Sequence, residues 1–249
     1  MGLPLVRDEN SVRWLTLNRP DVLNALTLED LTALREAVLG IGPEVRAIVV
    51  TGAGDRAFSS GMHVATFADL TPTTSRHVID EVGACLGAIR LAPVPTVAMI
   101  NGYCLGAAFE LALACDVRVA HAEVRFGLPE VKLGIPSVVE AALLPHYVGL
   151  SKAKEMILTG DLYAASDLPP GLVNRLAPRT QLREVTETLL RSLTMPTREV
   201  IAAQKSLFET WLNCGLEESI ATSKDVFAHM WDSPATAAAV ARYQSGRRV

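Results

Sequence analysis

The stretch that decides the fold is INGYCLGAAFE, which runs from Ile100 to Glu110. It ends a run of 19 residues, Leu91 to Phe109, that carries no charged side chain. A run of this length would suffice for a membrane-spanning helix, which needs about 20 mostly apolar residues. Because Pro93, Pro95 and Asn101-Gly102 interrupt it, we expect no membrane span. The pattern instead predicts a buried strand that turns into a buried helix.

Strands and helices are predicted to alternate on both sides of this stretch. A turn-rich DENS segment separates two short β-type runs, which predicts a hairpin, and a capping box at Thr27–Asp30 predicts a helix that ends at Gly40. The first half then comprises strands at 3–7, 12–17, 46–50, 95–100 and 116–120, and helices at 28–39, 78–89 and 107–114. Such alternation indicates an α/β fold with right-handed crossovers between parallel strands.

The second half of the chain is predicted to be almost entirely helical. One short strand is expected at 172–176, among helices at 138–146, 152–158, 182–193, 199–212, 217–231 and 235–243. The last three helices follow Pro196 and have no strand to pack on. Their apolar faces must be buried either on the α/β body or on a neighbouring subunit. We therefore divide the chain into a core, residues 1–195, and a helical region, residues 196–249.

Composition excludes several classes of protein. The 249 residues include 23 Lys and Arg against 27 Asp and Glu, and this net charge of −4 argues against nucleic-acid binding. Only 20% of the residues are charged, which indicates a large buried core. Arg7, Asp8 and Glu9 are unlike a signal peptide, so we expect a cytoplasmic protein. Free buried thiols are expected, since no CxxC spacing occurs among Cys85, Cys104, Cys115 and Cys214.

Three familiar motifs fit the sequence poorly. Residues 52–57, GAGDRA, match a dinucleotide-binding turn, but no amphipathic helix follows them. Ser59-Ser60-Gly61 lies after a strand, yet the chain contains no GxSxG nucleophile elbow. His63 could act as a base or be a solvated loop histidine, and the five histidines form no metal-ligand pattern. The sequence therefore predicts no metal site and no bound cofactor.

Small residues follow two of the predicted strands, in AFSSGM at 57–62 and in GYCLGA at 102–107. Small side chains let a substrate approach the backbone closely, and the free N–H groups at a helix start favour negative charge. Two such donors aimed at one oxygen form an oxyanion hole, in which each donor contributes about 3 kcal/mol of transition-state stabilisation. The two loops are therefore candidates for an oxyanion hole.

Two glutamates lie in apolar sequence beside these loops. Glu110 follows the uncharged run, and Glu130 ends the segment FGLPE. A carboxylate in apolar surroundings has a raised pKa and suits acid–base chemistry, unless it forms a structural ion pair. Arg125 and Lys132 are the candidate partners for such a pair. Residue types alone leave both interpretations open.

Considered together, these segments resemble the crotonase (enoyl-CoA hydratase/isomerase) superfamily over nearly the whole chain. The matching stretches are LNRP at 17–20, NAL at 24–26, AFSSG at 57–61, INGY at 100–103, CD at 115–116, FGLPE at 126–130 and GLVN at 171–174. The resemblance implies a spiral of ββα repeats instead of an ordinary doubly wound sheet. It also implies a C-terminal helical region that assembles trimers, often paired as hexamers.

The resemblance implies roles for individual residues. The backbone N–H groups of Met62 and Ala107 would polarise the thioester carbonyl of an acyl-CoA substrate. Glu110 would activate water for attack at C3 of a 2-enoyl-CoA, and Glu130 would deliver a proton to C2. No cofactor beyond the substrate's own coenzyme A is implied. The remaining substrate-binding or CoA-binding positions would be Ala25, Arg56, Ser60, Gly61, Gly106, Pro129 and Ser137.

The chain departs from the family pattern after Glu130. Residues 133–140 read LGIPSVVE, one residue shorter than the family's usual segment and without its glycines. Ser137 and the two valines could reshape the acyl pocket, and Glu140 could be a third carboxylate or a helix cap. His63 replaces a common Asp. The alternatives to a hydratase are an isomerase that uses Glu130 alone and a non-catalytic acyl-CoA-binding subunit.

Overall fold

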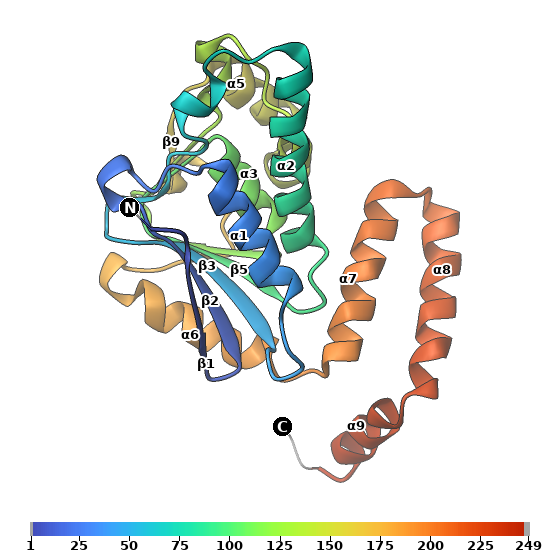
Figure 1. Cartoon of the computed structure of the whole chain (residues 1–249). Helices are drawn as coiled ribbons and strands as arrows, with labels where there is room; N and C mark the ends of the chain where they lie inside the picture. The colour runs from blue at the N-terminus through green and yellow to red at the C-terminus, as the bar shows by residue number, and fades with distance from the viewer. Residues whose placement is uncertain (1, 247–249) are drawn as a thin grey trace.

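The computed structural model describes residues 2–246 and is built around a six-stranded sheet (Figure 1). The strand order is β1-β2-β3-β5-β7-β10. Strand β1 is antiparallel to β2, which confirms the predicted hairpin, and every other neighbouring pair is parallel. The strands are β1 (Leu5–Glu9), β2 (Val12–Leu17), β3 (Ala47–Gly52), β5 (Thr96–Ile100), β7 (Val117–Ala120) and β10 (Arg175–Leu176).

A second, four-stranded sheet distinguishes this fold from a doubly wound sheet. It has the order β4-β6-β8-β9 and consists of β4 (Ala57–Ser59), β6 (Tyr103–Leu105), β8 (Arg125–Gly127) and β9 (Tyr163–Ala164). Strands β4, β6 and β8 each follow a strand of the larger sheet after a short turn. Each turn of the chain therefore adds one strand to each sheet, which confirms the spiral of ββα repeats. Strands of two or three residues are too short to show a hydrophobic period in the sequence.

Helices cover both faces of the six-stranded sheet (Figure 1). Helices α1 (Leu28–Leu39), α2 (Pro72–Arg90) and α3 (Ala107–Ala114) lie on one face, and α6 (Leu182–Leu193) lies on the other. Side chains alternate along β3, so that Ile48 and Val50 pack towards α1–α3 while Ala47 and Val49 pack towards α6. Burial on both faces explains why this strand is continuously apolar.

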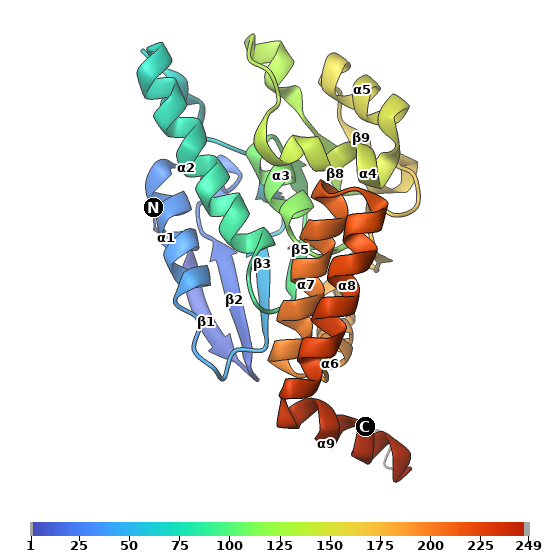
Figure 2. The same ribbon diagram turned by 90° about the vertical axis from the view of Figure 1, so that its right-hand side faces the viewer.

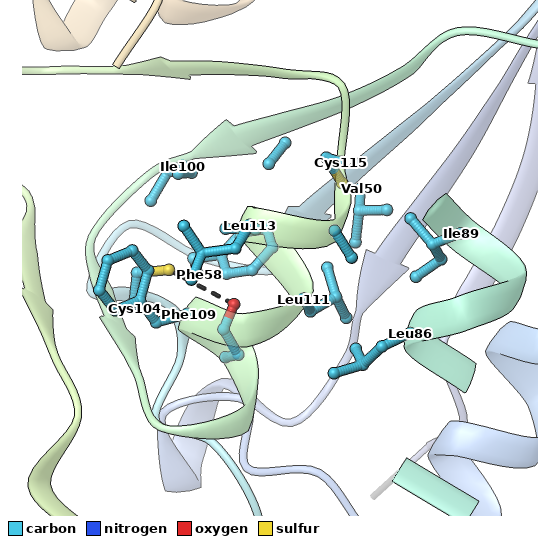
Figure 3. Packing of buried hydrophobic residues seen from close by; sticks show 14 of the residues in the cluster. Val50, Phe58, Leu86, Ile89, Ile100, Cys104, Phe109, Leu111, Leu113 and Cys115 are labelled. Atoms are coloured by element: carbon cyan, nitrogen blue, oxygen red, sulfur yellow. Dashed lines mark hydrogen bonds between the residues drawn. The ribbon is translucent and has the colours of Figure 1, made fainter. Parts of the chain in front are cut away.

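The uncharged run forms β5, β6 and the first turn of α3. Figure 3 shows Ile100, Cys104, Phe109 and Leu111 packed together with residues of α2 and β3. Most of the run is buried, including residues 94–98, so it lacks charge because it lies in the core. Across residues 2–246, no helix has both the length and the apolar character needed to cross a membrane.

The second half contains more short elements than its sequence predicts. The helix expected at 138–146 is a 3₁₀ helix, η4 (Val139–Leu143), followed by α4 (Leu144–Val148), and β9 was not predicted. The strand expected at 172–176 shrinks to the two residues of β10. The remaining helices of residues 2–246, with η marking 3₁₀ helices, are η1 (Pro20–Val22), η2 (Val64–Phe67), η3 (Pro129–Leu133), α5 (Leu150–Thr159), η5 (Ala165–Asp167), η6 (Arg179–Gln181), α7 (Arg198–Asn213), α8 (Leu216–His229), η7 (Met230–Asp232) and α9 (Pro234–Gln244).

The C-terminal helices are attached to the core through α7. The buried Lys205 donates to Asp116 Oδ2 at 2.6 Å and to the carbonyl of Val94 at 3.2 Å. Helices α7 and α8 run side by side (Figures 1 and 2). Large apolar side chains of α7, α8 and the following η7 remain exposed, namely Phe208, Trp211, Leu216, Ile220, Phe227 and Trp231. The core thus buries only part of the apolar surface of this region.

Candidate active site

A cavity of about 210 Å³ collects most of the site residues that the sequence predicts. Its lining includes Ser60, Gly61, Met62, Gly106, Ala107, Glu110, Pro129 and Glu130. These residues come from the loop after β4, the start of α3 and the helix η3. A larger cavity of about 630 Å³ lies against α7 and α8, but no carboxylate lines it. The smaller cavity is therefore the candidate active site.

The first small-residue loop is held in place by the segment NAL. Asn24 donates to the carbonyls of Ala53 and Ala57 at 3.0 and 2.9 Å. Leu26 forms a parallel bridge with Met62, in which Leu26 N donates to Gly61 O and His63 N donates to Leu26 O. In such a bridge the peptide N–H of Met62 points away from Leu26. The two hydrogen bonds therefore leave the N–H of Met62 free for a ligand.

The second small-residue loop reaches the first through two glycines. Gly106 adopts φ 55° and ψ −133°, a conformation that only glycine takes readily, and it is the N-cap of α3. A Cβ on Gly61 would lie 2.7 Å from the Leu105 carbonyl and 3.3 Å from the Ala107 nitrogen. Because Ala107 opens α3, its N–H has no intrahelical acceptor. The N–H groups of Met62 and Ala107 thus lie in two touching loops that line one cavity.

Glu110 and Glu130 face this cavity in surroundings that disfavour their charge. Burial raises the pKa of Glu110 to about 9, with further contributions from Glu130 and Glu140. Burial also raises the pKa of Glu130. Neither carboxylate forms an ion pair within residues 2–246, and Lys132 pairs with Asp161 instead. The structural ion pair that the residue types left open is therefore not formed.

Glu110→Gln is expected to stabilise the protein progressively as the pH rises. Glu110 has a pKa of about 9 in the folded chain and about 4.3 when unfolded, so the folded state binds more protons between these values. The free energy of unfolding of the wild type then falls with pH, by up to about 1.4 kcal/mol per unit. Urea denaturation at pH 5, 7 and 9 should show a growing advantage of the variant. Parallel curves for the wild type and Glu110→Gln would contradict the pKa shift.

Residues 137 and 138 lie beside the two carboxyl groups. The Ser137 hydroxyl donates to Glu130 Oε2 at 2.9 Å. The nearby Val138 backbone lowers the pKa of Glu110, although burial outweighs this effect. Ser137 was predicted as a substrate contact, and in the free protein its contact is with Glu130. The segment that departs from the family pattern therefore orients Glu130 and influences the pKa of Glu110.

Three other predicted residues lie outside the lining of the cavity. Ala25 is buried, and Arg56 is exposed on the turn before β4. His63 is the N-cap of η2, and its Nδ1 accepts from the Ala65 N–H at 3.3 Å. This contact gives His63 a structural role in closing the loop after Met62. The roles of Ala25 and Arg56 in binding coenzyme A stay predictions.

The sequence analysis missed one wall of the cavity. Val78, Ile79 and Val82 from α2 and Phe67 from η2 also line the cavity. The helical spacing of the α2 residues predicts one apolar face, but their sequence gives no sign that this face borders a cavity instead of the core. These side chains make one wall of the cavity apolar.

The chain resembles known proteins over its whole length. A family model described as enoyl-CoA hydratase/isomerase matches residues 7–248. A short-chain-enoyl-CoA hydratase of Clostridium acetobutylicum is 26% identical, over 92% of this chain and 89% of its own. A crotonyl-CoA hydratase of Syntrophomonas wolfei is 29% identical, over 90% and 87%.

A solved structure supports the same relationship. The crystal structure of an enoyl-CoA hydratase from Mycobacterium smegmatis superimposes with a TM-score of 0.93 at 29% identity, covering 100% of this chain and 98% of the other. The match extends over both sheets and the C-terminal helices. Together with the family model, it shows that the chain belongs to the enoyl-CoA hydratase/isomerase family.

Proposed function

We propose that this protein is an enoyl-CoA hydratase, which adds water across the C2=C3 bond of a 2-enoyl-CoA or catalyses the reverse dehydration. The observation that carries the proposal is the meeting of Glu110 and Glu130 with two backbone donors in one cavity. The hydratase relatives support an activity of this type. In this proposal the reaction needs no cofactor beyond the coenzyme A of the substrate.

In the proposed mechanism, the thioester oxygen binds between the N–H groups of Met62 and Ala107. Attack at C3 moves electrons towards this oxygen and forms an enolate. Donors held in place before the reaction stabilise that charge without reorganising. The N-terminal end of α3 contributes in the same direction, because a helix N-terminus favours negative charge. The acyl chain would lie against the apolar wall of α2.

The two glutamates would move the protons. Glu110 takes a proton from the attacking water, and Glu130 delivers a proton to C2. This step needs one proton on the pair, carried by Glu130. Burial raises the pKa of Glu110 to about 9 in the free protein, so Glu110 has to pass its proton to Glu130 before it can act as the base. The two carboxyl groups therefore titrate as a coupled pair, and activity is expected to fall once the pair loses its last proton at high pH.

A comparison of two substrates tests the proposed activity. The wild type is incubated separately with a 2-trans-enoyl-CoA and with a 3-enoyl-CoA, and the products are identified. Loss of the enoyl absorbance with formation of 3-hydroxyacyl-CoA is the expected result. Conversion of the 3-enoyl substrate alone would replace the hydratase by an isomerase. Binding without turnover across short, long, branched and aromatic acyl groups would indicate a non-catalytic subunit.

The exposed apolar surface of α7 and α8 supports a proposal about assembly. Side chains such as Trp211 and Phe227 remain about half exposed or more in the single chain. Exposed apolar patches of this kind mark interaction surfaces in soluble proteins. We propose a homotrimer or a hexamer of two trimers in the cytoplasm, formed through the region 196–249. Sedimentation of the purified protein tests the oligomeric state.

A further inference from the structure

The two oxygens of the Glu130 carboxyl group have different surroundings. Its Oε2 accepts a hydrogen bond from the Ser137 hydroxyl at 2.9 Å. Its Oε1 lies on the side of Gly106, since a Cβ on that glycine would approach it to 2.8 Å. Gly106 is the N-cap of α3 and directly precedes Ala107, whose N–H is the proposed donor to the thioester oxygen. Oε1 is therefore the oxygen of Glu130 that lies beside the proposed oxyanion hole.

The backbone brings Ser137 back to Glu130 within a short loop. Helix η3 ends at Gly134, which has a φ of 78°, a left-handed conformation that often ends helices. The N–H of Ile135 then donates to the backbone carbonyl of Glu130 at 3.2 Å. Two residues later, Ser137 reaches the side chain of the same glutamate. The backbone and the side chain of Glu130 are thus both held by the segment 134–137.

The residues that follow attach this segment to α2. Val139 has a φ of 42°, which is strained for a β-branched residue and persists only where the surrounding packing determines the backbone. Gly83 of α2 leaves room for it, because a Cβ there would lie 3.2 Å from Val139 Cγ1. Glu140 is buried against Arg90 at the end of α2, and this arginine also pairs with Glu209 of α7. Packing therefore holds both ends of the loop.

The carboxyl group of Glu130 has few polar neighbours. Among residues 2–246, Ser137 provides the only side-chain hydrogen bond to it. Glu110 is the other titratable residue of the cavity lining. Helix α5 packs against η3, and the other charged residues of these two helices are Lys132, Lys152, Lys154 and Glu155. None of these four lines the cavity, and three of them form ion pairs at 2.8 Å.

We propose that Ser137 is a positioning residue, which holds Oε2 of Glu130 so that Oε1 delivers the proton to C2 of the substrate. The delivery step rests on the proposed hydratase function, whereas the contact between Ser137 and Glu130 does not. In this step the electron pair of the enolate forms the C2–H bond. The O–H bond of Glu130 breaks, and its electron pair stays on Oε1.

The contact favours the transfer in the direction of hydration. A hydrogen bond to an ionised carboxylate is stronger than one to a neutral carboxyl group. The bond from Ser137 therefore strengthens as Glu130 gives up its proton. An interaction that is stronger in the transition state than before it accelerates the chemical step. The same bond restricts the rotation of the Glu130 side chain, so that Oε1 is already oriented when the substrate binds.

Hydration rates in H2O and D2O test the role of the hydroxyl. We expect Ser137→Ala to lower kcat for a 2-enoyl-CoA by about 10-fold, with a smaller change in KM. The ratio of kcat in H2O to kcat in D2O should rise, because proton delivery becomes slow relative to the other steps. Ser137→Thr keeps the hydroxyl and should restore most of both values. Ser151→Ala, at an exposed position of α5, should match the wild type.

The pH dependence of stability tests the contact without relying on activity. A hydroxyl that donates to a carboxylate favours the ionised form, so its removal raises the pKa of Glu130. The free energy of unfolding is compared between the wild type and Ser137→Ala from pH 4 to pH 9. The stability lost in the variant should grow as the pH rises through the titration of Glu130. In a Glu130→Gln background the difference should stay flat.

The outcomes separate the positioning role from the proposed function. If the wild type hydrates a 2-enoyl-CoA, an unchanged kcat and isotope ratio in Ser137→Ala overturn the role of Ser137 and leave the hydratase standing. A loss that Ser137→Thr does not restore overturns it as well. If the wild type hydrates no 2-enoyl-CoA, the hydratase and the delivery step are both rejected, and a pH-dependent stability difference upholds the contact alone. Should Ser137→Ala not fold, Ser137→Cys, whose thiol is a weak donor, replaces it with the same expected results.

Discussion

Glu110→Gln and Glu130→Gln should each lower kcat/KM for hydration of a 2-enoyl-CoA by about 10²-fold or more. Glutamine keeps the size of the side chain and the neutral, hydrogen-bonding head, but it can neither take nor deliver the proton that the reaction transfers. Both side chains line the same cavity, so the substitutions leave its shape nearly unchanged. Initial rates are measured as loss of enoyl absorbance over a range of substrate concentrations.

Binding and stability controls separate lost chemistry from lost structure. Neither variant removes the N–H groups of Met62 and Ala107, so the dissociation constant for a 3-hydroxyacyl-CoA should change little. Glu184→Gln, at an exposed position, should keep the wild-type rate. Wild-type rates in either cavity variant would refute its acid–base role. A loss of activity in Glu130→Gln but not in Glu110→Gln would favour the isomerase mechanism over hydration.

Arg118→Met should lower the free energy of unfolding by more than about 3 kcal/mol. Arg118 is 1% exposed, and its guanidinium donates to the carbonyls of Leu172, Ala112 and Cys115 at 2.6, 3.1 and 2.8 Å. Methionine fills a similar space but leaves these buried acceptors without donors, and each such loss costs about 1–3 kcal/mol. It also removes a positive charge from the C-terminal end of α3, where a cation is favourable.

Urea denaturation at neutral pH measures this loss, with Arg125→Met on β8 as the matched control. Arg125 is exposed, so its replacement should change the free energy of unfolding by less than about 0.5 kcal/mol. A loss below about 1 kcal/mol for Arg118→Met would show that burying the charge costs nearly as much as its hydrogen bonds contribute. Because α3 carries Ala107 and Glu110, the variant should also lose activity at temperatures where it remains folded.

Several of the family stretches contain a polar side chain that holds backbone groups of distant segments. Asn101 accepts from the N–H of Gly52 and donates to the carbonyls of Gly52 and Gly54. Asp116 accepts from the N–H and hydroxyl of Thr96 and from Lys205. Asn174 accepts from the N–H of Arg118. A buried side chain with several fixed partners tolerates few substitutions, so such stretches can be recognised in a sequence.

The departures from the family pattern were visible in the sequence, but their consequences were not. The replacement of glycines by Ser137-Val138-Val139-Glu140 is evident from the residues alone. That Ser137 holds Glu130, and that Glu140 is buried against Arg90, depends on how η4 packs against α2 and α3. Arg90 lies 50 positions away from Glu140 and Glu209 lies 119 positions away from Arg90, so no local spacing relates them.

The sequence by itself determined the family, the larger sheet, most helices and the two glutamates, because hydrophobic periods, caps and short motifs are local properties of the chain. Only the tertiary structure decided the second sheet, the apolar wall from α2 and the charge environment of Glu110. Strands of three residues carry no period, and burial and charge proximity depend on segments far apart in the chain. The pKa of Glu110 is such a property, since it is set by the residues packed around the carboxyl group rather than by its neighbours in sequence.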